Sequence, residues 1–369
     1  MEKWIKVKIS DLGQVVGGAT PSTKKDEYYN GDIAWITPKD LSDFKGRYIS
    51  RGERNITKAG KDSCSTQLLP KNTVLFSSRA PIGYVAIAEN EMCTNQGFKS
   101  VIPNEDIDYL FLYYLLKYNK ATIEAMGSGT TFKEVSGSTM RNIEVMIPES
   151  KDIQKKIAAI LDSIDSKIEN NQRINDNLQQ QVQAIYTSMF IDNADPAWEQ
   201  GQLSDLITVK YGKDHKKLAD GKYPVFGSGG IMRYVERPLY TGESVLIPRK
   251  GTLNNVMYVN EPFWSVDTMF FTEMKIPNVA KFVFHFVKAK DLASMNAGSA
   301  VPSMTTDILN AMELSIPSAE RLAEFESVVA PMYQAMQANN RESSKLAELR
   351  DNLLPKLMSG EVDVTTIDF

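Results

Sequence analysis

Three residues in the second half of the chain have a spacing that could support nuclease chemistry. Asp267 is followed by Glu273 and Lys275, and one large class of nucleases uses carboxylates and a lysine in this order to hold Mg²⁺ and a phosphate. Such spacing is common by chance, and the apolar run 269–271 between the acids is typical of a buried strand. The first half of the chain has no matching acidic pair. The pattern therefore favours a structural role and leaves a Mg-dependent nuclease as an alternative.

A second group of residues has the chemistry of nucleic-acid recognition. Arg and Lys suit phosphates and guanine edges, and Asn and Gln can pair with adenine through two hydrogen bonds. Residues of these types, together with Ser and Thr, cluster between expected strands. They are Lys24, Lys25, Lys39, Arg47, Ser77, Ser78, Arg79, Asn95, Gln96, Lys99, Thr130, Thr131 and Lys133 in the first half, and Lys213, Lys216, Lys217, Arg233, Arg249, Lys250, Asn254 and Asn255 in the second. A single charged loop residue is usually only solvated, but Arg79 and Arg249 both follow a Val-Leu strand, which favours a shared role.

Other catalytic and cofactor motifs are absent from the sequence. The Gly-Lys pairs are not followed by Ser or Thr, so the chain has no phosphate-binding loop of the G-x4-G-K-[ST] kind. The Gly-Ser-Gly runs lack the third glycine of a dinucleotide fingerprint. With two histidines and two cysteines in the whole chain, neither structural zinc nor a disulfide framework is expected. We therefore expect no catalytic residue, no cofactor and no metal in this chain.

The composition is that of an average soluble protein. Hydrophobic residues make up 42% and charged residues 24%, and no apolar run approaches the roughly 18 residues needed to cross a bilayer. The first residues lack the apolar core of a signal peptide, so we expect a cytoplasmic protein that does not contact a membrane. The net charge of −4 argues against a protein that coats nucleic acid. The acidic excess lies after residue 317, however, which leaves room for local basic surfaces elsewhere.

The chain repeats itself. The repeated motifs share residue types and order, and they are a Ser-Asp-Leu turn (10–12 and 204–206), a Val-Leu strand (74–79 and 245–250), a Gly-containing turn (126–129 and 295–298) and an Ile-Pro pair (147–148 and 316–317). The separation between copies is 194 residues at the first motif, 171 at the second and 169 at the last two. The first copy thus holds about 23 more residues between the first two motifs. Two copies with a common scaffold and a different middle surface suggest two related but different targets.

Each copy runs directly into a long segment with helical periodicity. Apolar residues recur at helical spacing over 150–190 and over 318–358, and the second segment also shows the sevenfold spacing typical of a coiled coil. Neither helix can bury its apolar stripe alone. We expect the two helices to pack on each other in antiparallel orientation, and the alternative is that each packs only on its own globular unit.

Polar residues interrupt both apolar stripes near their midpoints. Asn171 and Asn175 interrupt the first stripe, and Asn339 and Ser343 interrupt the second. Buried polar residues of this kind can set the register of an antiparallel pair. Pro331 should kink or restart the second helix, because proline lacks an N–H and clashes with the preceding turn.

These patterns predict an α+β fold made of two repeated α/β domains separated by two long antiparallel coiled-coil helices. Short β-type runs bounded by Pro, Gly and Asn occur in both copies, with helical stretches at 109–118 and 280–287. The predicted segments are a first domain at 1–149, a central helix at 150–192, a second domain at 193–317 and a C-terminal helix at 318–369.

Strings in a fixed order along nearly the whole chain resemble the specificity subunit of a type I restriction-modification system. They are Gly-Gly-Ala-Thr-Pro at 17–21, Asp-Ile-Ala-Trp-Ile at 32–36 with Lys-Asp-Leu at 39–41, Leu-Leu-Pro at 68–70, Ser-Ser-Arg-Ala-Pro-Ile-Gly at 77–83, Asn-Gln-Gly-Phe-Lys at 95–99, Gly-Ser-Gly-Thr-Thr-Phe-Lys at 127–133, Ile-Pro at 147–148 leading into 153–161, and the run at 349–361. No single string is decisive, but their order is highly specific.

The resemblance implies two target-recognition domains separated by two long antiparallel helices. It implies a non-catalytic subunit that reads a bipartite site in double-stranded DNA, one half per domain, with an unread gap of fixed length. The helices would set that gap and would bind two methyltransferase subunits that carry S-adenosylmethionine and methylate adenine. Restriction (translocase) subunits would use ATP and Mg²⁺ to translocate and cut. Two alternatives remain, a Mg-dependent nuclease acting through Asp267, Glu273 and Lys275, and a coiled-coil scaffold without a DNA role.

Overall fold

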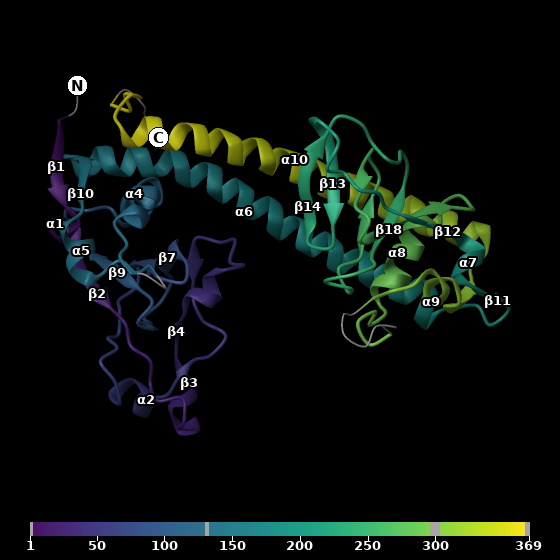
Figure 1. The fold of residues 1–369 in the computed structure, drawn as a ribbon, viewed down its shortest axis with the longest axis horizontal. Helices are drawn as coiled ribbons and strands as arrows, with labels where there is room; N and C mark the ends of the chain where they lie inside the picture. Colours follow the sequence, from purple (N-terminus) through teal and green to yellow (C-terminus); the bar gives the residue numbers. More distant parts are fainter. Residues whose placement is uncertain (1–2, 130–132, 296–302, 366–369) are drawn as a thin grey trace. The chain divides into compact units, whose positions relative to one another are not determined.

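The computed structural model describes residues 3–129, 133–295 and 303–365 (Figure 1). The chain divides into two compact units, unit 1 with residues 1–172 and 340–369, and unit 2 with residues 173–339. Helices α6 (Lys151–Thr187) and α10 (Ala319–Met358) each contribute one part to either unit. The boundaries between the two compact units therefore fall inside the predicted helical segments.

Unit 1 is built on a five-stranded sheet in the order β2-β9-β6-β7-β5. The strands are β2 (Gly13–Gly17), β9 (Lys99–Pro103), β6 (Val74–Ser78), β7 (Ile82–Ala88) and β5 (Tyr48–Ile49). The strand β6 is buried along its whole length because both of its faces are covered. Val74 and Phe76 pack with helix α3 (Tyr109–Tyr118), while Leu75 packs with Phe98 on the opposite face.

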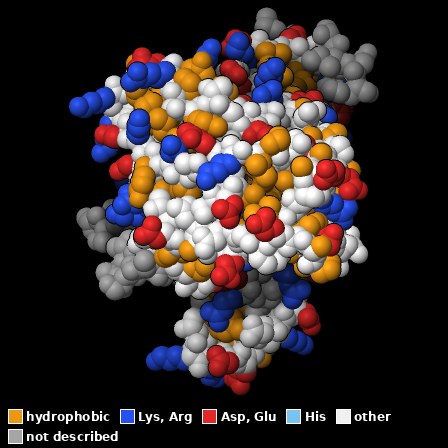
Figure 2. All heavy atoms as spheres, turned by 90° about the vertical axis from the view of Figure 1, so that its right-hand side faces the viewer, with side chains coloured by type: hydrophobic (Ala, Val, Ile, Leu, Met, Phe, Trp, Pro, Cys, Tyr) orange, Lys and Arg blue, Asp and Glu red, His pale blue; other side chains and the backbone are white. Residues whose placement is uncertain are grey.

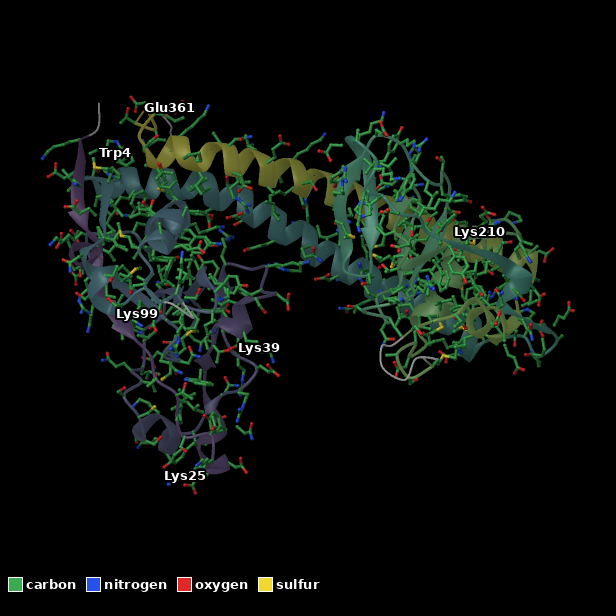
Figure 3. The ribbon with its side chains drawn as sticks, viewed as in Figure 1. Trp4, Lys25, Lys39, Lys99, Lys210 and Glu361 are labelled. Carbon is green, nitrogen blue, oxygen red and sulfur yellow. The ribbon has the colours of Figure 1, made fainter. Side chains whose placement is uncertain are left out.

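Smaller elements surround this sheet. The pairs are β1 (Trp4–Lys8) with β10 (Glu144–Pro148), antiparallel, and β4 (Trp35–Ile36) with β8 (Cys93–Thr94), parallel. The other elements are α1 (Ile9–Leu12), η1 (Asp26–Tyr28), β3 (Tyr29–Ile33), η2 (Pro38–Leu41), α2 (Lys58–Asp62), α4 (Lys120–Ala125) and α5 (Gly137–Asn142). The segment after α10 returns to β1, where Val362 and Val364 share a core with Trp4 (Figure 3).

Unit 2 has a four-stranded sheet in the order β12-β18-β15-β16 and a three-stranded sheet in the order β14-β13-β17. The strands are β12 (Ile207–Tyr211), β18 (Met269–Met274), β15 (Ser244–Pro248), β16 (Met257–Val259), β14 (Gly230–Val235), β13 (Asp220–Gly227) and β17 (Trp264–Ser265). The antiparallel pair of β11 (Glu199–Gln202) and β19 (Glu313–Ile316), the helices α7 (Leu203–Leu206), α8 (Ala280–Lys288) and α9 (Thr306–Asn310), and the π-helical turn η3 (Ser188–Asp192) are the further elements.

The sequence repeat is a structural repeat. The antiparallel pair β1-β10 recurs as β11-β19, and the parallel pair β4-β8 recurs as β13-β17. The Ser-Asp-Leu motif forms the short helices α1 and α7, in which Asp11 and Asp205 each accept a backbone N–H three residues earlier, at 2.8 and 2.7 Å. The extra residues of the first copy lie mainly between β4 and β6, at 37–73. The predicted α+β class with two repeated units is confirmed.

The polar interruptions of the long helices meet within each unit, as predicted. In unit 1 the Asn171 amide of α6 donates to Glu342 Oε2 at 2.7 Å and to Ser343 Oγ at 3.2 Å. In unit 2 the Asn339 amide of α10 donates to Asn175 Oδ1 at 2.8 Å. Positions that increase along α6 thus meet positions that decrease along α10, so the helices are antiparallel within both units, and the predicted register is confirmed.

Of the kink or restart predicted at Pro331, the restart is wrong. Helix α10 continues through this residue from Ala319 to Met358. Proline removes one backbone hydrogen bond, but Phe325 and Val329 before it and Met336 after it are buried on unit 2. This packing holds the helical path across the missing bond.

No helix among the described residues is long and apolar enough to cross a membrane.

Equivalent helices join each sheet to the long helices. In unit 1 the Tyr114 hydroxyl of α3 donates to Asp165 Oδ2 of α6 at 2.8 Å. In unit 2 the corresponding residue of α8 is His285, whose ring nitrogens lie 2.9 Å from Gln183 Oε1 of α6 and 2.9 Å from the Tyr333 hydroxyl of α10. Both units therefore use a buried polar contact at the same position to fix the sheet on the helices.

Candidate nucleic-acid interface

One carboxylate organises the basic residues at the end of the central strand of unit 1. Glu134 lies 3.5 Å from Arg79 Nη1 and 3.3 Å from Lys99 Nζ, through different oxygens. Backbone bonds place it there, since Glu134 pairs with Ser128 and the next residue, Val135, donates to the Ser78 carbonyl at 3.0 Å. The end of β6, the start of β9 and the segment after α4 therefore converge, and the exposed Lys133 lies next to this cluster.

A second loop of unit 1 carries Asn95 and Gln96. The backbone of the Gly-Gly-Ala-Thr-Pro segment packs directly on it, because Ala19 N–H donates to Thr94 O at 3.1 Å and the Thr20 hydroxyl donates to Gln96 Oε1. A side chain at Gly18 would meet Thr94 O at 2.1 Å, so only glycine permits this approach. Asn95 Oδ1 accepts the Gly97 N–H at 2.8 Å. The Asn95 side chain thus shapes the loop, and Gln96 is its exposed amide.

Unit 2 repeats this arrangement with different residues. Gly212 would carry a Cβ 2.0 Å from Val266 O, and Lys213 N–H donates to Ser265 O at 2.8 Å. An indole caps the free carbonyl in both units. Trp35 donates to Ala19 O at 3.1 Å in unit 1, and Trp264, from the other strand of the parallel pair, donates to Lys213 O at 2.8 Å in unit 2. The exposed Lys213 is therefore held at the position of Ala19.

Arg249 and Lys250 follow the central strand of unit 2. The Arg249 guanidinium lies 5.4 Å from the Tyr211 ring centroid, and its Nη1 donates to Asp267 O at 3.4 Å. Arg249 O accepts the Met304 N–H at 2.9 Å, which matches the bond between Val135 and Ser78 in unit 1. The backbone of the exposed Lys250 forms a β-bridge with Ser303. In the repeat, Ser303 stands at the position of Glu134 in unit 1. Among the described residues, no carboxylate side chain contacts the basic pair of unit 2 as Glu134 contacts that of unit 1.

Several predicted contact residues use their polar side-chain groups in hydrogen bonds within the fold. Ser77 and Ser78 are fully buried, and their hydroxyls donate to Pro81 O at 2.8 Å and Gly97 O at 3.2 Å. The Asn254 amide donates to Asp291 at 2.9 Å, and the Asn255 amide donates to Ser228 O at 2.7 Å. Because these groups hold the loops in shape, we leave the four side chains out of the interface proposed below.

Arg47 is also turned away from these loops. Its side chain is buried against α6, where it contacts Asp162, Ser166 and Glu169. A guanidinium with these partners fixes the 37–73 segment to the helix. Its position in the fold could not be read from sequence, because an arginine in a loop is equally compatible with exposure.

The remaining predicted lysines and arginines are spread over each unit. Figure 3 shows Lys25, Lys39 and Lys99 on separate parts of unit 1, and Lys24 is exposed beside Lys25. Lys25 lies 3.0 Å from the Tyr28 hydroxyl, and Lys39 pairs with Glu53 at 2.7 Å. In unit 2, Lys216 and Lys217 are exposed, while Arg233 donates to Leu218 O and Asp220. Thr130 and Thr131 lie outside the described residues. The structure thus groups Arg79, Lys99 and Lys133, but not these outlying residues.

Exposed apolar residues on β14 were not identified from the sequence as site candidates. Ile231 is 52% exposed, Met232 61% and Tyr234 50%, and they flank Arg233. Arg233, with Tyr234 beside it, carried a sequence signal, whereas Ile231 and Met232 carried none. On the face drawn in Figure 2, Lys and Arg alternate with Asp and Glu among the coloured residues, without a large surface of one charge. Binding of an anionic polymer would therefore depend on local clusters.

Comparison with known proteins identifies the family. A model of the type I restriction modification DNA specificity domain matches residues 1–180 and again residues 196–325. This chain belongs to that family.

Two relatives of this specificity-family chain match most of its length. It is 32% identical to the specificity subunit of the type I restriction enzyme MjaIX from Methanocaldococcus jannaschii, over 98% of this chain and 94% of that protein. It is 25% identical to the EcoprrI specificity subunit of Escherichia coli, over 85% and 83%. The crystal structure of the type I S subunit from M. genitalium superimposes with a TM-score of 0.65 at 20% identity, over 96% of both chains. The shared fold agrees with the predicted class.

The nuclease alternative is not supported in this specificity-family chain. Glu273 on β18 pairs with Lys210 on β12 at 3.5 Å, and Lys275 Nζ donates to Ser204 O at 2.6 Å. The run 269–271 is buried, as predicted. Within the described parts of the chain, no group of three or more His, Cys, Asp or Glu residues could hold a metal ion. Glu273 and Lys275 therefore stabilise strand β18 and its neighbours.

Proposed function

We propose that this chain is the non-catalytic DNA-reading subunit of a type I restriction-modification complex. Each unit would read one half of a bipartite site in double-stranded DNA. One observation carries the assignment: in a chain of the specificity family, each unit presents basic residues on a rigid loop at the end of its buried central strand. These are Arg79 with Lys99 in unit 1 and Arg249 with Lys250 in unit 2.

The contacts available to these residues suit base recognition. A guanidinium can donate two hydrogen bonds to guanine, which contributes about 1–3 kcal/mol of discrimination. Arg79 and Glu134 are each about one third exposed, at 35% and 38% of the side chain, so DNA could replace the carboxylate as the partner of Arg79. The contact of the Arg249 guanidinium with the Tyr211 ring restrains its position. Gln96 and Lys133 would add contacts to bases and phosphates.

We further propose that α6 and α10 have two roles in the assembled enzyme. They run from one unit into the other, so their length would set the unread gap between the half-sites. Their exposed faces would bind two methyltransferase subunits, which would carry S-adenosylmethionine. Restriction subunits would supply ATP- and Mg-dependent translocation and cleavage. The complex would act in the cytoplasm, where the host DNA is found.

The experiment that tests this function is a map of N6-methyladenine in the native host with and without the gene. Loss of methylation at a single bipartite motif with a fixed gap, restored by the wild-type gene, is the expected result. Complementation with Arg79→Ala should fail to restore the motif, whereas Arg51→Ala, which changes an exposed arginine of the same unit, should restore it. An unchanged map in cells that express the partner subunits would contradict the proposal.

A further inference from the structure

A pocket of about 250 Å³ opens in unit 1, and none of the residues of the basic cluster described above lines it. It lies between η2 with the residues that follow it, the start of β7, and helices α3 and α4. Cationic and aromatic side chains dominate its lining, and they are Lys45, Lys117, Lys120, Phe44, Tyr84 and Tyr113. No acidic residue is among the residues that line it.

The charge of this pocket is not balanced within the described structure. No carboxylate in the described ranges forms an ion pair with any of the three lysines. Asp165, the acid with the largest effect on the pKa of Lys117, already accepts hydrogen bonds from Arg350 at 2.7 Å and from Tyr114 at 2.8 Å. Burial lowers the pKa of Lys117, as expected of an ammonium group without a full counter-charge.

Buried cations elsewhere in the protein are neutralised. Lys281 in unit 2 is 3% exposed, and it pairs with Glu243 at 2.8 Å and with Glu326 at 2.6 Å. A cation removed from water is costly unless it is paired. Of the three pocket lysines only the half-buried Lys117 resembles Lys281, because Lys45 and Lys120 are exposed. Unlike Lys281, Lys117 forms no ion pair with a carboxylate of the described residues, and a bound anion would supply the missing counter-charge.

Two of the three lysines, Lys117 and Lys120, have local contacts. Lys117 Nζ lies 3.4 Å from the Tyr113 hydroxyl and 5.2 Å from the centre of that ring. Gly83 has a φ of +97°, and a Cβ there would lie 2.6 Å from the Lys120 side chain. The aliphatic part of Lys120 thus rests on the β7 backbone, and glycine is required both for the backbone conformation and for this contact.

Unit 2 shows which part of this arrangement is specific to unit 1. At the repeat separation of 171 residues, Lys117 corresponds to Lys288, which lies 5.0 Å from the Phe284 ring in the same manner. The position of Lys120, however, is taken by Asp291, whose carboxylate accepts a bond from Asn254. Phe44 and Lys45 belong to the 37–73 segment, which holds most of the extra residues of the first copy. The contact of a lysine with an aromatic ring is therefore common to both units. Lys45 and Lys120, which complete the three-lysine pocket, belong to unit 1.

We propose that this pocket binds a phosphate group, carried either by the DNA backbone or by a free nucleotide. Three ammonium groups match the charge and the acceptor oxygens of a phosphate, and the aromatic side chains offer contact area to an attached sugar or base. The DNA source rests on the proposed function. The pocket is connected to the proposed interface through one turn, because Leu41 of η2 lines the pocket and Pro38 of the same turn packs on the Gly97 loop.

The first test measures binding of pyrophosphate and of ADP to the full chain by calorimetry at low salt. Lys117→Met removes the charge and keeps the aliphatic volume, Lys117→Arg keeps the charge, and Lys288→Met is the matched change in unit 2. A free-nucleotide site predicts that Lys117→Met weakens binding at least tenfold, whereas Lys117→Arg and Lys288→Met bind like the wild type. Lys120→Gln, at an exposed position, repeats the test if Lys117→Met does not fold.

The second test separates the DNA source from the free nucleotide. Affinity for a duplex is measured against salt, with the motif and with an unrelated sequence. A DNA phosphate in the pocket predicts that Lys117→Met weakens both duplexes equally and lowers the slope of log affinity against log salt by about 0.9. Unchanged binding of pyrophosphate, ADP and both duplexes would overturn the proposal. Arg79→Ala on the motif duplex reports independently on the proposed function, so either idea can fail alone.

Discussion

Arg47 and Glu169 form a two-pronged ion pair that joins the segment specific to the first copy to helix α6. Arg47 Nη2 lies 2.8 Å from Glu169 Oε2, and its Nε lies 2.9 Å from Oε1. The guanidinium also contacts Asp162 and donates to Ser166 Oγ at 2.9 Å. Arg47 is only 5% exposed. This pair anchors the 37–73 segment to helix α6 within unit 1.

Arg47→Ala should destabilise unit 1 substantially. Removing one partner leaves two acids without their counter-charge, which costs about 3 kcal/mol, the lower end for a buried pair because Glu169 and Asp162 keep part of their exposure. Urea unfolding of the full chain measures the loss, and Arg51→Ala, at an exposed position in the same segment, is the control. Equal unfolding midpoints for the two variants would show that the pair does not stabilise the unit.

Asn175→Ala tests the polar register of the helices in unit 2. Asn175 is 3% exposed and accepts a hydrogen bond from Asn339. Truncation removes this part-buried hydrogen bond, so the free energy of unfolding should fall by about 1–2 kcal/mol. Asn177→Ala, at an exposed position of the same helix, should change it by less than about 0.5 kcal/mol. Thermal unfolding of both variants makes the comparison, and an equal effect would argue against a register role.

Unit 2 should lose stability in mild acid through His285. Burial, with a smaller effect of Lys288, lowers the pKa of His285 to about 4, while the unfolded side chain titrates near about 6.5. The unfolded chain therefore binds a proton that the folded chain rejects. The stabilising contribution is complete above pH 6.5 and is lost as the pH falls toward 4, with a magnitude on the order of 3 kcal/mol.

His285→Gln checks this pH dependence. Glutamine can still bond to Gln183 and Tyr333 but does not titrate. The difference in unfolding free energy between wild type and variant should shrink or reverse in favour of the variant between pH 7 and pH 5. Hydrogen exchange of the α8 amides across that range locates the effect in unit 2. A difference that stays constant with pH would falsify the assignment to His285.

Arg79→Ala and Arg249→Ala should each relax recognition of one half-site. The loss of a two-bond contact with a base costs about 1–3 kcal/mol, or roughly 5- to 150-fold in affinity. Binding by the purified complex to duplexes with changes in either half-site measures which half each variant no longer distinguishes. Lys217→Ala, which removes an exposed lysine, should instead weaken all duplexes equally. If both arginine variants relax the same half-site, the assignment of one half per unit is wrong.

Changing the gap between the half-sites by one base pair should abolish recognition. One base pair rotates one half-site by about a tenth of a helical turn relative to the other, and helices α6 and α10 would not lengthen to follow it. Binding and methylation are measured on duplexes with the gap changed by one pair in each direction, with base changes inside an unchanged gap as the control. Full activity on the altered gaps would contradict the proposed spacing role.

The sequence by itself determined the repeat, the long helices and the pairing of their polar interruptions. These features depend on periodicity and order along the chain, which persist whatever the surrounding fold. Helical spacing requires an apolar stripe to find a partner, and Asn171, Asn175, Asn339 and Ser343 then have few places to meet. The same local rules misjudged Pro331, because tertiary burial of Val329 and Met336 outweighed one missing hydrogen bond.

The tertiary structure alone decided what the polar loop residues do. Ser78, Asn254 and Arg47 carry the same groups as exposed recognition residues, yet contacts far away in sequence bind them within the fold. Glu134 became the centre of the basic cluster only because strand pairing brings it to Arg79 and Lys99. Residue type specifies which hydrogen bonds a side chain can make, but its direction and its partners are set by long-range packing, which no local pattern encodes.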